Sequence, residues 1–351
     1  MNKTHYEAAY AYLKNTIEID EFVHKGRITH PGGMDFAELH IAIKEMWPRV
    51  QTLPIEIFAY YSNVLFHLYQ MKYHEEKVYV VTQQLAQQLA DTSLNVNCRY
   101  LKSPFKEIFI QIDKGLFQIF DVQTLKEVDV EGIYVYLNED GIHREIRIMA
   151  ASLLKSNEQY PFNDSIFYFR FYMDEGDKIK DKVDKYLEDP AIWSNINTKK
   201  CDGGINKKYI ATLSNFVFNT LLYVTSKDAD IQAMLPFRPT GLKKARKQKK
   251  EQAKIARTSA LPYILVGGNV KQSCEQVVSI SKWKLQHRVY VEGYWRIQWY
   301  GSIKNDTRNA QTIWIAPYHK GPELAEVINK VHLINHPAHK GRGFKPESLS
   351  R

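Results

Sequence analysis

Aromatic residues alternate along residues 165–174, which read SIFYFRFYMD. Successive side chains of a β-strand face opposite sides, so Phe167, Phe169 and Phe171 share one side of this segment. Three phenylalanines on one side of a sheet need an apolar layer to cover them. We therefore predict a strand with one face in the core, and we expect the N-terminal helices to supply the covering layer.

Four shorter β-rich runs come before this segment, at residues 106–113, 116–121, 132–138 and 144–150. Lys114-Gly115 lies between the first two runs, and Glu139-Asp140-Gly141 lies between the last two. A glycine with a polar neighbour is typical of a hairpin turn. The pattern predicts an antiparallel meander of about five strands.

The first hundred residues favour helices instead of strands. We predict four helices, over residues 4–25, from Asp35 to Pro48, from Pro54 to Tyr69 and from Tyr73 to Ala90. Apolar residues recur at helical spacing in these stretches. Asp35 is a suitable N-cap, and proline is favoured in the first turn of a helix and excluded from its interior.

The complete pattern predicts an α+β protein. In it, N-terminal helices pack on the antiparallel meander, and a long central helix (Ile205 to Thr225), a basic segment and a small C-terminal β-rich module follow. The expected divisions are an N-terminal helical region at 1–100, the sheet with helices at 101–235, a basic segment or linker at 236–261, the C-terminal Trp/Arg module at 262–335 and a flexible tail at 336–351. The module contains β-rich runs at 263–267, 277–281, 287–291, 294–301 and 312–317.

Positive charge is concentrated in one segment. The chain has a net charge of +9, and residues 238–257 hold nine basic residues against one acid, which leaves +1 for the rest. The candidate contact residues in this segment are Lys243, Lys244, Arg246, Lys247, Lys249 and Lys250. Such a run releases counterions from a phosphate backbone without reading bases. Contact with nucleic acid or a ribosome and a solvated interdomain linker are both compatible with it.

Several functional classes lack their signatures. The sequence has no GxxxxGK[ST], no GxGxxG after a strand and no HExxH. Its three cysteines, at 98, 201 and 274, are too far apart for a CxxC metal site. The start has no signal pattern, and no apolar run reaches the length of a membrane span. We expect a cytoplasmic protein with no cofactor, no metal and no membrane partner, and the absence of catalytic motifs favours a non-enzyme.

Tryptophan and basic residues gather between residues 283 and 314. Four of the six tryptophans lie there, at 283, 295, 299 and 314. Alternation along a strand puts Tyr294, Arg296 and Gln298 on one face, and the tryptophans at 295 and 299 on the other. We expect Trp295 and Trp314 to lie on neighbouring strands and to be largely buried.

Three interpretations of this cluster remain open. Aromatic faces beside arginine suit base stacking and phosphate contact, with His287, Arg288 and Arg296 as the contact residues. The same composition suits the core of a small β-module. A third interpretation is metal-independent RNA cleavage by His287, Arg296 and His319.

The stretches HRVYVEGYWRIQWYGS and IWIAPYHKG resemble the C-terminal signature of the AcrVA-two-like family of type V-A anti-CRISPR proteins. The matching positions are His287, Gly293, Trp295, Arg296, Trp299, Gly301, Trp314, Pro317 and Gly321. The chain departs from the signature at Tyr290-Val291-Glu292, where the family is basic, and at Tyr294, where the family often has histidine. These departures weaken a catalytic or phosphate-binding role for those positions.

This resemblance implies a protein of a phage or other mobile element that silences a host defence gene. Members of the family stop production of the type V-A effector nuclease. They are expected to recognise its N-terminal peptide during synthesis and to cause the loss of its mRNA. The implied partners are therefore that nascent peptide and an RNA or a ribosome. A general RNA-binding or ribosome-associated regulator and a metal-independent ribonuclease remain the alternatives.

Overall fold

A computed structural model of the chain describes residues 4–46, 55–121, 126–152, 166–189, 203–234, 262–270, 288–303, 305, 307–320 and 327–328. The chain divides into two compact units. One consists of residues 1–273 and 292–317, and the other of residues 274–291 and 318–351. A search of the described part of the chain finds no helix with the length and apolarity needed to cross a membrane.

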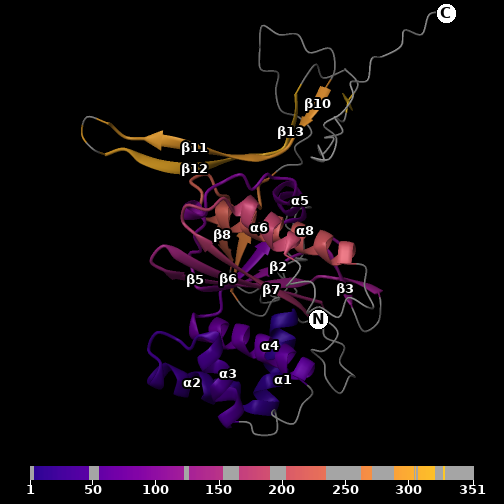
Figure 1. The fold of residues 1–351 in the computed structure, drawn as a ribbon, viewed down its shortest axis with the longest axis vertical. Coiled ribbons are helices and arrows are strands. Elements are labelled where there is room, and N and C mark those ends of the chain that lie inside the picture. The colour runs from indigo at the N-terminus through magenta and orange to yellow at the C-terminus, as the bar shows by residue number, and fades with distance from the viewer. Residues whose placement is uncertain are drawn as a thin grey trace, which may run out of the picture. The chain divides into compact units, whose positions relative to one another are not determined.

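A seven-stranded mixed sheet forms the centre of the larger unit (Figure 1). Its strands, in the order β7-β6-β5-β2-β1-β9-β8, are Ile166–Asp174, His143–Ala151, Gly132–Asp140, Glu107–Gln111, Val78–Val81, Tyr263–Val266 and Ile231–Met234. The first four are antiparallel neighbours, as the predicted meander requires. β1 is parallel to both β2 and β9. The α+β class is confirmed, and the parallel strands extend the predicted sheet.

Two predictions for the segment from Tyr73 to Asp121 were wrong. The helix predicted from Tyr73 to Ala90 contains β1 and the shorter helix α5 (Gln83–Ala90). All four residues of β1 are buried, and a short apolar run of this kind does not show by periodicity whether it is a strand or a helix. Residues 118–121 form β3, which pairs with β4 (Lys126–Asp129) in a separate two-stranded sheet, so no hairpin joins β3 to β2.

The run at 263–267, which the sequence analysis places with the C-terminal module, forms β9 of the central sheet. β9 lies beside β1 and is also antiparallel to β8, where Met234 faces Tyr263. The basic segment begins and ends at these two neighbouring strands, and its own residues lie outside the described ranges. β9 is mostly buried, and it pairs with β1, which lies nearly two hundred residues earlier in the chain. A local sequence pattern cannot reveal such a distant partner.

Four N-terminal helices cover one face of the sheet (Figure 1). They are α1 (His5–Ile17), α2 (Ile19–Thr29), α3 (Phe36–Met46) and α4 (Ile55–Tyr73). The single helix predicted over residues 4–25 is broken at Glu18, which has a left-handed backbone with φ 49°. The predicted cap of α3 is present, since the Glu38 backbone N–H donates to Asp35 Oδ1 at 2.8 Å.

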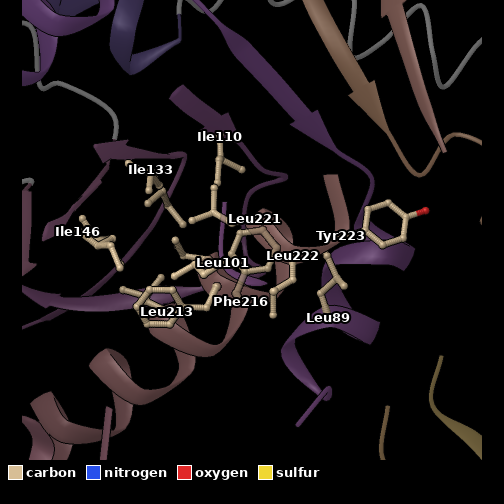
Figure 2. Packing of buried hydrophobic residues seen from close by; sticks show 14 of the residues in the cluster. Leu89, Leu101, Ile110, Ile133, Ile146, Leu213, Phe216, Leu221, Leu222 and Tyr223 are labelled. Carbon is tan, nitrogen blue, oxygen red and sulfur yellow. The ribbon is translucent and has the colours of Figure 1, made fainter. Parts of the chain in front are cut away.

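The helices α6 (Ile179–Glu188) and α8 (Gly203–Val224) cover the opposite face. Figure 2 shows Ile110, Ile133 and Ile146 of three strands directed toward α8. The facing residues of α8 are Leu213, Phe216, Leu221 and Leu222.

The phenylalanines of β7 belong to this second layer. The ring of Phe171 lies 5.3 Å from that of Phe218 and 4.8 Å from that of Tyr186. The expectation that N-terminal helices cover these phenylalanines is therefore wrong. Tyr168, opposite Met149 on β6, lies on the other face of the sheet, which those helices cover, and it is 44% exposed.

A polar pair is buried beneath the N-terminal helices. His67 Nδ1 of α4 lies 2.9 Å from Glu107 Oε1 of β2, and both side chains are fully buried. Burial lowers the pKa of His67 to about 3 and raises the pKa of Glu107 well above its ordinary value. Removing a charge from water is costly, so the pair is held as neutral imidazole and protonated carboxyl. Nearby, His5 Nδ1 lies 3.0 Å from the hydroxyl of Tyr134, which is also buried.

The neutral form of Glu107 predicts a specific pH dependence. In the unfolded chain Glu107 loses its proton above about pH 4.3, whereas the folded protein keeps that proton. The contribution of Glu107 to stability therefore falls as pH rises, by up to about 1.4 kcal/mol per pH unit. Glu107→Gln removes this loss, so urea unfolding should show the variant gaining stability relative to the native protein between pH 5 and pH 7. The exposed Glu45→Gln variant is the control. A constant difference across this range would mean that Glu107 is ionised in the folded protein.

Candidate functional site

The motif around residues 293–317 forms an antiparallel ribbon of two strands, β11 (Tyr294–Tyr300) and β12 (Asn309–Ile315). Figure 1 shows the strands side by side as one long hairpin. Trp295 is directly opposite Trp314, as expected for neighbouring strands. Gly301 follows β11 with φ 88°, and a Cβ there would overlap the carbonyl oxygen of Thr307. The glycine is therefore required by the turn.

Trp295 attaches the ribbon to α8. Its side chain is 8% exposed, and its Nε1–H donates to Asn219 Oδ1 at 2.7 Å. The amide nitrogen of Asn219 donates in turn to the carbonyl oxygens of Leu89 and Thr92, at 2.9 and 2.8 Å. The side chain of Asn219 thus joins β11, α8 and the end of α5.

Trp314 attaches β12, the second strand of the ribbon, to the end of α5. Its Nε1–H donates to Thr92 Oγ1 at 3.1 Å, and the Thr92 hydroxyl donates to the carbonyl oxygen of Gln88 at 2.7 Å. The Trp314 ring meets the Tyr223 ring edge-on at 5.2 Å. Trp314 is partly buried, and Trp295 is buried as the sequence predicts.

Gly293 lets the backbone approach this contact closely. Its carbonyl accepts from the Ser93 N–H at 2.8 Å, and its own N–H donates to the Asp91 carbonyl at 3.3 Å. A Cβ on Gly293 would overlap Thr92 Oγ1. We call the set Thr92, Asn219, Gly293, Trp295 and Trp314 the ribbon anchor. Two glycines and two tryptophans of the signature are therefore explained by the fold of the ribbon.

Beyond the anchor, the ribbon carries aromatic rings beside cations. Trp299 is 50% exposed, and the Arg308 guanidinium lies 4.7 Å from its ring centroid. Lys227 Nζ, just after α8, lies 4.2 Å from the ring centroid of Tyr300. Arg296 is exposed on β11. Trp299 lies on one face of β11, whereas Arg296 and Tyr300 lie on the other, and we call Trp299 and its neighbour Arg308 the ribbon surface.

The smaller unit contains a three-stranded sheet in the order β13-β10-β14. These strands are Tyr318–Lys320, Arg288–Val291 and Val327–Ile328. Arg288 begins β10, and the ring of Tyr290 meets that of His319 at 5.4 Å. Arg288 and Arg296 therefore belong to different compact units, as do Arg296 and His319.

Part of the predicted site lies outside the described residues, namely Lys243, Lys244, Arg246, Lys247, Lys249, Lys250, His287 and Gly321. Pro317 is described and is buried after β12. No motif in the sequence pointed to Thr92, Asn219, Tyr223 or Lys227. Asn219 had a usable signal, because a polar residue within the apolar run at 216–224 needs a hydrogen-bond partner when it is buried.

The anchor predicts that the indole N–H of Trp295 contributes to stability separately from its ring. Trp295→Phe keeps an aromatic ring but leaves the buried Asn219 Oδ1 without its donor, which should cost about 1–3 kcal/mol. Trp295→Ala should cost about 3–5 kcal/mol. Chemical denaturation measures both. The matched control is the exposed Trp299→Phe, expected within about 0.5 kcal/mol of the native protein. Equal effects of the two Trp→Phe changes would show that the Asn219 bond contributes nothing.

Comparison with known proteins found a matching family model and a solved structure with a similar fold. The family model named AcrVA2-like, described as the anti-CRISPR type V subtype A2 family, matches residues 79–321. A solved structure described as the crystal structure of AcrVA2 is similar to the chain with a TM-score of 0.52 and 11% identity. The similarity covers 90% of this chain and 99% of that one, and at this identity it shows the fold alone. None of the curated proteins compared with the chain matches it.

Proposed function

Because the chain belongs to the AcrVA2-like family of anti-CRISPR proteins, we propose that it lowers expression of a type V-A effector nuclease instead of inhibiting the finished enzyme. In this proposal the protein recognises the N-terminal peptide of the effector during synthesis, and the effector mRNA is then lost. The observation that carries the proposal is the extent of the family match. It includes the central sheet from β1 onward, the ribbon anchor and the whole ribbon.

In this proposal the protein contacts one translating ribosome complex twice, once at the nascent peptide and once at the mRNA, and the two contacts together select the message. A nascent peptide is tethered to its own mRNA through the ribosome. A protein that binds the peptide therefore meets that message at a high effective concentration, and its contact with RNA needs no sequence specificity. Peptide recognition selects the gene in this scheme, and RNA contact acts on the message.

The proposed RNA contacts are the basic segment and two arginines in or beside the motif. The candidates in the segment are Lys243, Lys244, Arg246, Lys247, Lys249 and Lys250, whose charge suits a phosphate backbone. Arg288 and Arg296 are the candidates near the motif. The anchor already explains how Trp295 and Trp314 serve the fold. Arg296 follows Trp295 on β11 and is exposed, so it is available to contact a partner.

A reporter experiment separates peptide recognition from RNA recognition. The first codons of the effector gene are fused to a fluorescent protein in three forms: native, synonymously recoded and frameshifted. Recoding changes the RNA and keeps the peptide, whereas the frameshift keeps almost all of the RNA and changes the peptide. We expect the reporter mRNA, measured by quantitative PCR, to fall for the native and recoded forms only.

The other outcomes of this experiment are also informative. A fall for all three forms would support a general RNA-binding or ribosome-associated regulator. No fall for any form would overturn the proposal. Cleavage of RNA by the purified protein, lost on His287→Ala, would instead favour the ribonuclease alternative.

Arginine variants test whether the contact residues act apart from the fold. Arg288→Ala and Arg296→Ala should each lose silencing, measured as reporter mRNA level, while the melting temperature stays near that of the native protein. Arg170→Ala is the matched control, because Arg170 is an exposed arginine on β7, a strand of the central sheet outside the motif. A loss of silencing in proportion to a lower melting temperature would mean that the arginines serve only the fold.

A further inference from the structure

The apolar face of the ribbon continues beyond the part that the anchor covers. Trp295, Ile297 and Trp299 share one face because successive side chains of a strand alternate. Their exposed fractions are 8%, 37% and 50%, so exposure increases from the anchor toward the turn. Trp314, Thr312 and Ala310 of β12 are opposite them. The outer half of this face is therefore not used to hold the ribbon on the body.

The net charge of the ribbon is positive, and cationic side chains lie next to its aromatic rings. Neither β11 nor β12 contains a carboxylate, and residues 294–315 have a net charge of +2. Arg308 stacks over Trp299, and Lys227 lies over Tyr300. Among the described residues, no carboxylate forms an ion pair with Arg296, Arg308 or Lys227.

This combination fits a single-stranded nucleic acid better than a duplex. Every base has a π-face, so aromatic side chains with neighbouring cations bind a single strand regardless of its sequence. A duplex hides these faces within its base stack. Tryptophan and arginine are also enriched in protein–protein interfaces, so binding of the effector's N-terminal peptide is one of the outcomes tested below.

We propose that the ribbon surface is a binding site for single-stranded RNA. Trp299 offers a ring for base stacking, and Arg308 beside it contacts a phosphate. Arg296 and Tyr300 lie on the other face of β11 and are not part of this site. The choice of RNA rests on the proposed function, in which a message is the second partner. The anchor keeps this surface in a fixed relation to α8, so the Trp299 ring does not have to be ordered by the RNA.

Binding of a fluorescein-labelled oligouridine to the full-length protein, measured by anisotropy, tests the proposal. A duplex of the same length is compared at about 0.1 M and 0.3 M salt, because higher salt weakens purely ionic binding by the basic segment. We expect the single strand to bind more tightly than the duplex at the higher salt. Trp299→Ala should weaken single-strand binding about tenfold at both salt concentrations, with Trp299→Phe recovering most of the loss.

Two further variants make the result specific. Arg308→Ala should weaken binding and reduce the slope of log affinity against log salt by about one, because one phosphate contact is lost. Tyr172→Ala is the matched control, since Tyr172 is a 59% exposed aromatic residue beside a cation on β7 and is not part of the ribbon. It should leave RNA affinity unchanged, and melting temperatures establish that all variants are folded.

The proposal is overturned if the native protein has no RNA affinity, or if Trp299→Ala and Arg308→Ala bind as the native protein does. It is also overturned if Tyr172→Ala has the same effect, or if the ribbon variants lose binding of the effector's N-terminal peptide and keep their RNA affinity. The reporter assay distinguishes failure of the proposed ribbon site from failure of the proposed function. Silencing by a native protein that binds no RNA overturns the ribbon site alone. RNA binding through Trp299 without silencing supports the site and overturns the function.

Discussion

One side chain, Asn219, connects parts of the chain that are far apart in sequence. Its amide donates to two carbonyl oxygens at the end of α5 and accepts from the indole of Trp295 on β11. All of these groups are shielded from water, so each hydrogen bond is costly to lose. Asn215, one turn earlier on α8, also donates to the carbonyl oxygens of Ala90 and Thr92. The position of the ribbon therefore depends on α8, and α8 in turn depends on the core of the sheet.

This arrangement separates the residues that hold the ribbon from those that face solvent. The anchor uses the first tryptophan pair, whereas Trp299 lies two residues further along the same face and is half exposed. A sequence signature rich in tryptophan and glycine therefore contains two kinds of information. Its glycines and anchored tryptophans specify the fold, and its exposed tryptophan and arginine specify a surface.

Strong periodicity allowed much of the fold to be predicted. The alternation along residues 165–174 correctly gave β7, a turn that contains the predicted Gly141 joins β5 to β6, and Asp35 caps α3. β1 was missed because its four apolar residues carry no distinguishing period. The pairing of β9 with β1 was missed because parallel partners are distant in sequence and no turn marks them.

The site was predicted in part for the same reason. Alternation along β11 separated Trp295 from Arg296 correctly, and the register with β12 placed Trp314 opposite Trp295. The residues that receive the ribbon, Thr92 and Asn219, lie on other elements, and their role exists only after the chain has folded. A local pattern can identify one side of such a contact and leaves the other side unknown.

The pairing of β8 with β9 has a consequence for how this chain can vary. Residues 235–262 leave the sheet at Met234 and return to it at the directly opposite Tyr263. The cost of closing a connection between two fixed ends grows only with the logarithm of its length, by about 0.6 kcal/mol for each doubling. Insertions and deletions between these strands are therefore inexpensive for the sheet. Selection can therefore adjust the number of positive charges in this connection without redesigning the core.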